Sequence, residues 1–284
     1  MKLNKEIITS RQNPTVKAVR ALSDKKGRRS AQQFRFDGIK LFSDGYPRVD
    51  IVKTVLKCPV SEEVEAALDA AIKSGALSED KLLIVSESVF ETLTDESSPE
   101  GIITVAKYMT ELHATATADS FDAKSLSGKR LLIAESLRDA GNLGTVMRSC
   151  AALGIDLLVL TDDFADLYNP KTVRSAMGAL FRLPTLILPR EELPKAIQEL
   201  REDGRCVYAA ALRENGRTVG EMKLRGADCF VIGNEGHGLS DEVISACTDT
   251  AKIPMTEGSE SLNAAAAAAI CIWETVRSTD MAEG

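Results

Sequence analysis

The sequence predicts an α/β protein with two domains, the C-terminal one built on a parallel sheet. Short, nearly continuous apolar runs alternate with longer segments of helical periodicity along the 284 residues, which favours buried strands covered by helices. Residues 109–128 interrupt this alternation, because they are rich in Thr, Ala, Ser and Asp. We therefore expect one domain over 1–108, a linker over 109–128 and a second domain over 129–284.

The N-terminal half is predicted to begin with a helix, because Asn13 can cap it and Pro14 suits its first turn. The basic run KKGRR at 25–29 is expected to end that helix. Acidic residues in the first turn favour a further helix over 61–73. Three short apolar runs complete a predicted small α/β sandwich, with strands over 49–56, 82–85 and 101–106.

The C-terminal half alternates more regularly. Strands are predicted over 130–136, 156–161, 184–188, 205–211, 227–233 and 251–255. Helices are predicted over 142–153, 169–180, 191–202 and 261–278. Parallel sheets of this kind bind ligands beyond the carboxyl ends of their strands, so functional residues are expected in the segments that follow the strands.

Composition excludes several classes of protein. The chain is 44% hydrophobic and 27% charged, as in soluble globular proteins. No run reaches the roughly 20 apolar residues of a membrane helix, and the first residues lack the apolar core of a signal peptide, so we expect a cytoplasmic protein. The six cysteines form no Cys-x-x-Cys pair and only two histidines exist, which favours reduced buried thiols and no metal site.

Charge is distributed unevenly along the chain. The formal net charge is −7, but residues 1–57 carry +9 and the remaining 227 residues carry −16. Phosphate binding requires a local basic face and not a basic protein. An ordinary solvated surface is the alternative interpretation of the basic segment.

The first motif is ESLRDAGNLGTVMRSCAALG at 135–154, where a strand leads through a turn into a helix. Asn142 and Arg148 are six residues apart and do not share a helical face. They can converge only if Asn142 lies in the turn. Taken alone, the asparagine could be a helix cap and the arginine a solvated side chain.

The second motif is VIGNEGHGLS at 231–240, a strand that enters a turn with three glycines. Glycine allows the backbone to approach a ligand closely. The order differs from the dinucleotide fingerprint Gly-x-Gly-x-x-Gly. Glu235 would repel a pyrophosphate but tolerate a ligand with positive charge, such as the sulfonium of S-adenosylmethionine. A simple tight turn is the alternative, and His237 is expected to be a loop residue.

The third motif is IPMTEGSESLN at 253–263, followed by an alanine-rich helix. Ser261 and Asn263 stand where that helix begins, so these side chains and the free N–H groups could hold a polar ligand. Simple N-capping is the alternative. Small residues along the helix could pack closely against another helix, within the fold or across a dimer.

The order of these motifs resembles the SpoU (TrmH-like) branch of the SPOUT methyltransferases. The resemblance rests on Asn142-x-Gly144-x-x-x-Arg148, then GNEGHGLS, then IPM followed by ESLNAAAAAAICIWE, and it covers about 130–278. NPKTVRSAMGALFRLP at 169–184 is also similar to the family. ITSRQNPTVKAVRAL and FRFDGIKLF at 34–42 resemble the family's substrate-binding domain. The alanines at 264–269 depart from the frequent Val-Ser-Val-Ala, which affects the expected substrate pocket or helix packing.

The resemblance implies a C-terminal trefoil-knotted methyltransferase domain preceded by a small RNA-binding domain similar to a ribosomal protein. General fold rules argue against a knot. It also implies a homodimer with the active site near the subunit interface. Bound S-adenosylmethionine would contact mainly backbone, at Gly233, Ile253 and Leu262, with Ala210, Asn234, Gly236 and Met255 nearby.

The resemblance further implies 2′-O-methylation of an RNA ribose. The residue matching Arg148 is often assigned as proton acceptor, but a guanidinium stays protonated above pH 12, so orienting a phosphate and stabilising charge suits Arg148 better. Asn142, Glu235, Ser261 and Asn263 are expected to position the reacting groups. The basic N-terminal segment supplies the expected RNA contacts: Arg11, Lys17, Lys25, Lys26, Arg28, Arg29 and Arg35.

Three other functions compete with methylation of ribosomal RNA. The same chemistry could act on transfer RNA, although the separate N-terminal domain favours ribosomal RNA by analogy. A non-catalytic RNA-binding protein for ribosome assembly is a second alternative, which the intact motif residues argue against. A nucleotide-dependent dehydrogenase is disfavoured, because neither half has Gly-x-Gly-x-x-Gly after its first strand.

Overall fold

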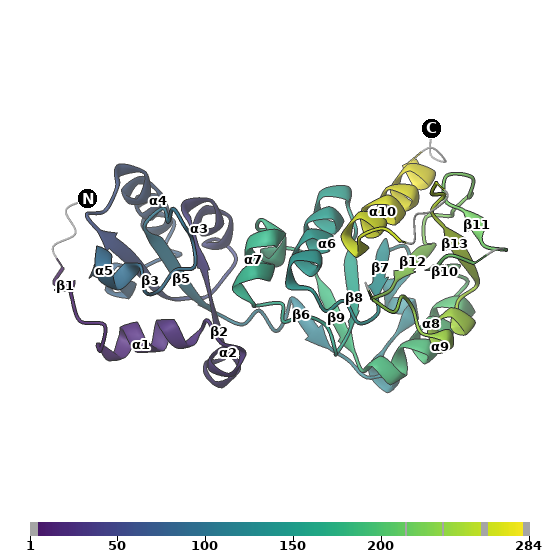
Figure 1. Cartoon of the computed structure of the whole chain (residues 1–284), viewed down its shortest axis with the longest axis horizontal. Helices are drawn as coiled ribbons and strands as arrows, with labels where there is room; N and C mark the ends of the chain where they lie inside the picture. Colours follow the sequence, from purple (N-terminus) through teal and green to yellow (C-terminus); the bar gives the residue numbers. More distant parts are fainter. Residues whose placement is uncertain (1–4, 214, 235, 257–260, 281–284) are drawn as a thin grey trace. The chain divides into compact units, whose positions relative to one another are not determined.

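The computed structural model describes residues 5–213, 215–234, 236–256 and 261–280. The chain forms two compact units, one of Met1–Met109 with Asp166–Phe181 and one of Thr110–Ala165 with Arg182–Gly284 (Figure 1). Both units are α/β, as the alternation of apolar runs predicts. None of the described helices has the length and apolar character needed to cross a membrane.

The first unit contains a five-stranded mixed sheet in the order β1-β4-β3-β5-β2. β5 runs antiparallel to β2 and β3, and the other pairs are parallel. Its strands are β1 (Ile7–Ile8), β2 (Gln33–Asp37), β3 (Ile51–Cys58), β4 (Leu82–Ser86) and β5 (Ile102–Lys107). Its helices are α1 (Pro14–Ala21), α2 (Lys25–Ala31), α3 (Ile39–Gly45), α4 (Glu62–Lys73), α5 (Glu87–Phe90) and α7 (Pro170–Ala176), with 3₁₀ turns at Glu79–Lys81 and Ala179–Phe181.

Two apolar cores cover the faces of this sheet. Val16 and Val19 of α1 pack with Val55 of β3 on one face. Leu68 of α4 packs with Leu56 on the other. Alternating side chains of one strand thus serve opposite cores, which confirms the predicted sandwich.

Local signals place the first helix as predicted. The Asn13 side chain accepts hydrogen bonds from Thr15 N (2.9 Å) and Val16 N (3.4 Å). α1 ends at Ala21, and the basic run forms the separate helix α2 and does not merely interrupt the first one.

Residues 166–181 belong to the first unit although they lie far along the chain. The Tyr168 ring stacks on Tyr108 with centroids 4.0 Å apart, and Phe181 meets Phe36 at 5.0 Å. Asp166 pairs with the buried Arg28 at 2.7 Å. The first unit is therefore completed by a segment from the middle of the sequence.

The second unit contains an eight-stranded sheet in the order β11-β13-β10-β12-β7-β8-β9-β6, with every pair parallel. Its strands are β6 (His113–Thr115), β7 (Leu131–Ala134), β8 (Leu157–Thr161), β9 (Thr185–Leu188), β10 (Val207–Ala210), β11 (Arg217–Thr218), β12 (Cys229–Ile232) and β13 (Asp249–Lys252). Its helices are α6 (Ala140–Leu153), α8 (Leu193–Glu202), α9 (Asp241–Ala246) and α10 (Ala264–Asp280), with 3₁₀ turns at Ala118–Ser120, Ala123–Leu126 and Arg190–Glu192.

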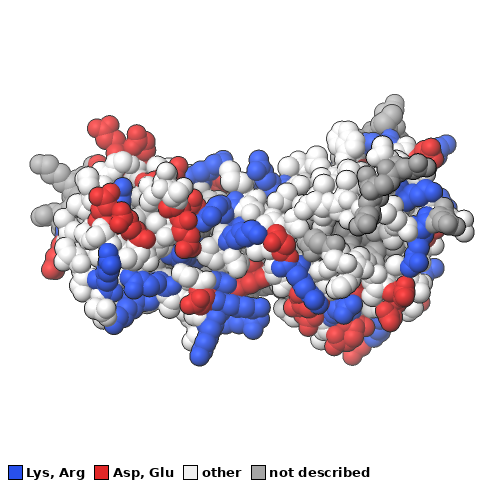
Figure 2. All heavy atoms as spheres, viewed as in Figure 1, with Lys and Arg blue, Asp and Glu red and all other residues white. Residues whose placement is uncertain are grey.

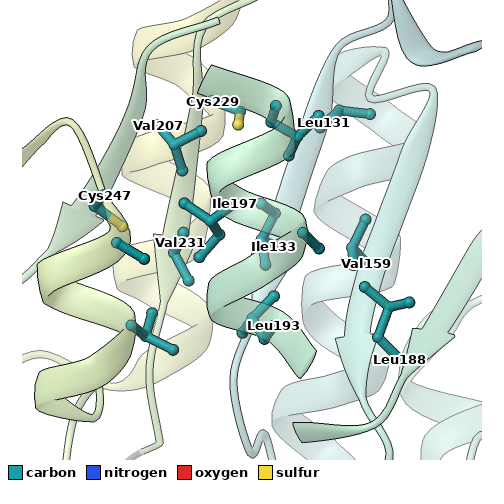
Figure 3. Close-up of a cluster of buried hydrophobic side chains, with 14 of the residues drawn as sticks. Leu131, Ile133, Val159, Leu188, Leu193, Ile197, Val207, Cys229, Val231 and Cys247 are labelled. Atoms are coloured by element: carbon teal, nitrogen blue, oxygen red, sulfur yellow. The ribbon is translucent and has the colours of Figure 1, made fainter. Parts of the chain in front are cut away.

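Helices cover both faces of the second sheet. On one face α8 places Leu193 and Ile197 over Ile133 of β7 and Val231 of β12, with Cys247 beside them (Figure 3). On the other face α10 packs against α6 and β12. Ala264, Ala265 and Ala268 are buried, so these three small residues of α10 serve close packing within the fold.

The strands and helices predicted for the C-terminal half are all present, with shifted limits, but the helix expected over 169–180 is α7 and belongs to the first unit. The strand expected over 251–255 begins at Asp249 and ends at Lys252. The expected linker contains β6, which pairs with β9, and buries Phe121 and Leu126. β6 has only three residues, and its place depends on a partner strand far along the chain, which local periodicity does not reveal.

Candidate active site

The three motifs meet at the carboxyl-end edge of the second sheet. β7 and β12 are neighbouring parallel strands, and both end here, at Ala134 and Ile232. The first motif continues from β7 into α6, and the second continues from β12 into α9. The third motif follows β13 and leads to α10.

A cavity of about 480 Å³ lies beside these segments. It is lined by all seven residues expected to contact a cofactor: Ala210, Gly233, Asn234, Gly236, Ile253, Met255 and Leu262. Its volume falls in the range of small-molecule sites. Sequence reasoning missed other lining residues. Leu212 and Arg213 follow β10, where the sequence carries no motif. His237 and Leu239 stand in the second motif, where His237 was expected to be only a loop residue.

The glycine turn needs glycine at 233 for a steric reason. A Cβ there would lie 2.3 Å from the carbonyl carbon of Gly238 and 2.5 Å from Leu239 N. The turn is closed by two backbone hydrogen bonds between Asn234 and Gly238, of 3.0 and 2.9 Å. Gly238 has a φ of +67°, which other residues rarely adopt.

Asn234 fastens the turn to the end of β7. Its side-chain oxygen accepts from Gly236 N (2.8 Å) and His237 N (3.3 Å). Its Nδ2 donates to the carbonyl of Ser136 at 2.8 Å. The side chain of Asn234 therefore shapes the turn that lines the cavity.

Asn142 and Asn263 meet although 121 residues separate them. Asn263 Nδ2 donates to Asn142 Oδ1 at 3.0 Å. The Oδ1 of Asn263 also caps α10 by accepting from Ala265 N (2.9 Å) and Ala266 N (3.3 Å). Asn263 is thus both a helix cap and a bridge between the first and third motifs.

Arg148 does not meet Asn142 within one chain. α6 begins at Ala140, so Asn142 lies inside the helix and not in the turn before it. Six residues of α-helix separate the two side chains by about 120° around the axis and about 9 Å along it. Arg148 is exposed and makes no hydrogen bond or ion pair with any described residue. The convergence that the sequence required is not found.

The two remaining expected catalytic residues are Ser261 and Glu235. Ser261 is exposed and lines the cavity. Glu235 lies outside the described residues.

A polar network supports the start of the first motif. Ser136 has a φ of +55°, and its N–H donates to Thr161 Oγ1 at 2.7 Å. Ser136 Oγ and Arg138 Nη2 each donate to Asp163 Oδ2 at 2.7 Å. Burial would raise the pKa of Asp163, but hydrogen bonds from Arg138, Ser136 and Thr161 outweigh it and lower that pKa below its ordinary value.

Burial corrects two of the expected RNA contacts. The side chains of Arg28 and Arg35 are both only 2% exposed and pair with Asp166 (2.7 Å) and Asp95 (3.1 Å). Arg28 also donates to the carbonyls of Leu22 and Ser23. Both arginines are therefore structural, because a guanidinium held inside the unit does not reach a phosphate.

The other five basic residues of that set lie on the surface. The exposed residues are Arg11, Lys17, Lys25, Lys26 and Arg29. Figure 2 shows Lys and Arg side chains gathered over α1 and α2. This basic surface can attract an RNA backbone.

The cysteines are free, and four of the six are buried. Burial raises the pKa of the Cys229, Cys247 and Cys271 thiols to about 12, which makes them unreactive near neutrality. In the described part of the chain, no group of three or more His, Cys, Asp or Glu could hold a metal ion.

Comparison with known proteins identifies the family. The sequence pattern of the SpoU rRNA methylase family matches residues 129–273. The chain belongs to this family. An MRM3-like substrate-binding domain matches residues 13–104, so the SpoU methylase domain of this enzyme follows a substrate-binding domain in sequence.

Relatives of similar length support the assignment. The chain is 32% identical over 266 residues to the 23S rRNA (guanosine(2553)-2′-O)-methyltransferase RlmP of Bacillus subtilis, covering 94% of this chain and 97% of that protein. The S-adenosylmethionine-bound crystal structure of an rRNA methyltransferase from Sinorhizobium meliloti is 27% identical and covers 96% of this chain and 97% of its own, with a TM-score of 0.79. An RNA 2′-O ribose methyltransferase structure is 25% identical, with a TM-score of 0.78 and coverage of 96% and 99%. This SpoU protein is an S-adenosylmethionine-dependent RNA 2′-O-methyltransferase.

The cavity fits the methyl donor. Its lining combines backbone of the glycine turn with Ile232, Leu239 and Leu262, which suits an adenosine held by main-chain hydrogen bonds between apolar side chains.

Proposed function

We propose that this SpoU enzyme methylates the 2′-hydroxyl of one ribose in ribosomal RNA of the large subunit, and that the cavity holds its S-adenosylmethionine. The observation that carries the proposal is the meeting of all three motifs at one edge of the second sheet. The seven residues Ala210, Gly233, Asn234, Gly236, Ile253, Met255 and Leu262 would surround the cofactor, which supplies an electrophilic methyl group.

The protein contributes mainly by positioning. A ribose hydroxyl is a weak nucleophile, so its oxygen must lie in line with the methyl donor. Ser261 lines the cavity, and Asn263, two residues further along the chain, is joined to Asn142 at 3.0 Å. We assign them, with Glu235, to orient the ribose.

Arg148 would orient the neighbouring phosphate and stabilise charge. Since one chain does not bring Arg148 to Asn142, the proposal includes a homodimer in which the partner's Arg148 completes each site. Trp273 of α10 is 55% exposed, on the helix that packs against α6, and aromatic side chains are enriched at protein interfaces.

Mixing two inactive variants tests the shared site. Arg148→Ala and Asn142→Ala should each abolish methylation. An equimolar mixture should recover about a quarter of wild-type activity, because half of the dimers are mixed and one of their two sites is intact. No recovery, with subunit exchange shown separately, would place Arg148 in the same chain as its Asn142.

The basic surface of the first unit is proposed to bind RNA through Arg11, Lys17, Lys25, Lys26 and Arg29. Deletion of residues 1–108 would be a poor test, because it also exposes the aromatic side chains of 166–181. Charge reversal at Lys25 and Lys26 leaves that packing intact. It should weaken RNA binding and reduce its dependence on salt, and unchanged affinity would contradict the proposal.

We also propose that the chain of the second unit forms a trefoil knot. We further propose that the protein is cytoplasmic. Both rest on family membership.

Substrate choice is tested by methyl transfer from labelled S-adenosylmethionine to unmethylated 23S rRNA and to transfer RNA. The proposal expects label in the 23S fraction. The B. subtilis relative, which is named for a guanosine of 23S rRNA, favours this outcome. Label in transfer RNA alone would overturn the substrate, and no label in either would favour a non-catalytic assembly protein.

A further inference from the structure

Glu135 is a buried carboxylate that follows β7 directly, at the centre of the carboxyl-end edge. Its side chain is 3% exposed. Its backbone N–H donates to the carbonyl of Ile232 at 2.9 Å, which extends the pairing of β7 with β12. A carboxylate so deeply placed needs compensating partners.

Both carboxylate oxygens of Glu135 have such partners. Oε2 accepts from the backbone N–H of Ser240 at 2.8 Å, and Oε1 accepts from Arg190 Nε at 3.2 Å. Ser240 ends the glycine turn and caps α9, where its Oγ accepts from Val243 N at 3.4 Å. Glu135 therefore fixes the end of the turn that lines the cavity.

The start of the same turn is fixed by the next residue along the chain. The carbonyl of Ser136 accepts from Asn234 Nδ2 at 2.8 Å. Two consecutive residues after β7 thus hold both ends of the turn between Asn234 and Ser240. These two side-chain contacts add to the pairing of β12 with β7 in fixing the described part of the turn to the first motif.

Arg190 supports the carboxylate from the opposite side. Its side chain is 49% exposed, and its backbone N–H donates to Asp162 Oδ1 at 3.2 Å. It therefore ties the segments after β8 and β9 to Glu135. Since Arg190 is half exposed, its charge is screened by solvent, and the contact with Ser240 is the stronger restraint.

We propose that Glu135 is a positioning residue for cofactor binding, which acts by holding the glycine turn at Ser240. This rests on the proposed function of the cavity as the S-adenosylmethionine site. Loss of the acceptor frees the end of the turn, so binding must first order it again. A hydrogen bond to a carboxylate is strong enough for this to weaken binding measurably.

The test is calorimetric titration of the full-length chain with S-adenosylmethionine. Glu135→Ala should raise the Kd on the order of tenfold. Glu135→Gln should stay within about threefold of wild type, because its amide oxygen can still accept from Ser240 N–H.

Asp228 provides a matched control. Its side chain is also 3% exposed, and it accepts from Cys206 N (3.0 Å) and Arg225 N (2.9 Å), beside Cys229 at the opposite end of β12. Asp228→Ala should lower stability as much as Glu135→Ala while leaving the Kd unchanged.

Three results would overturn the inference while wild type still binds the cofactor. These are a normal Kd for Glu135→Ala, an equal rise for Asp228→Ala, and a Gln variant as weak as the Ala variant. A wild-type chain that binds no S-adenosylmethionine would instead overturn the assignment of the cavity.

Discussion

Asn263 joins the third motif to the first, and its two roles can be separated by substitution. Asn263→Ala removes both the cap of α10 and the bridge to Asn142. Loss of an N-cap costs about 1 kcal/mol, and loss of a partly exposed side-chain hydrogen bond costs about 0.5–1 kcal/mol. The expected destabilisation is therefore about 1.5–2 kcal/mol in total.

Asn263→Ser keeps a capping oxygen but is too short to reach Asn142. It should cost only about 0.5–1 kcal/mol, which corresponds to roughly 1–4 °C in the midpoint of thermal unfolding. Methyl transfer should fall strongly in both variants, because the bridge is lost in both. Protein concentration must be equal throughout, because a dimer's midpoint depends on it.

A double-mutant cycle with Asn142→Ala isolates the bridge. Denaturant unfolding should give a coupling energy of about 0.5–1 kcal/mol between positions 142 and 263. Additive effects, with full methyl transfer in Asn263→Ser, would refute the reasoning that these two motifs are joined at the site.

Three further changes have expected outcomes. Gly233→Ala should weaken S-adenosylmethionine binding by an order of magnitude or more and cost about 1–3 kcal/mol of stability, because the added Cβ meets backbone atoms. Calorimetric titration measures the binding and denaturant unfolding measures the stability. Gly204→Ala is the control, because its φ of +91° is also strained for alanine but a Cβ there meets nothing within 4 Å. Asp163→Asn should have a lower free energy of unfolding than wild type at neutral pH. This difference should vanish as the pH falls through the lowered pKa of Asp163, because a carboxylate with a depressed pKa stabilises the fold only while it is ionised. A difference that persists in acid would contradict this. Arg28→Met should cost about 3 kcal/mol by leaving Asp166 unpaired, and a stable variant with reduced RNA affinity would instead return Arg28 to the RNA surface.

The alternation of apolar runs predicted most strands and helices of the second unit, and the resemblance to the SpoU family placed seven of the residues that line the cavity. The seven expected cofactor residues lie at or after strand ends or just before a helix, and the parallel sheet brings such segments to one edge. The hydrogen bond between Asn142 and Asn263 joins the first and third motifs, each of which had more than one interpretation when taken alone. Their order was more informative than any single residue.

The sequence alone does not reveal the hydrogen bonds and ion pairs that support the site and the first unit. Glu135 stands in the first motif, but its partners Arg190 and Ser240 lie 55 and 105 residues further along the chain, and no periodicity links them to it. The run KKGRR showed basic charge but not which side chain turns inward. Arg28 does, because Asp166, 138 residues away, is there to pair with it.

The most direct test of the account is the alkaline stability of the methylated product. Ribosomal RNA labelled from S-adenosylmethionine is hydrolysed in base, where each cleavage requires a free 2′-hydroxyl. The account predicts label in alkali-resistant dinucleotides, and its loss with Arg148→Ala. Label recovered in mononucleotides would mean methylation of a base, and would contradict the assignment of the site to ribose 2′-O-methylation.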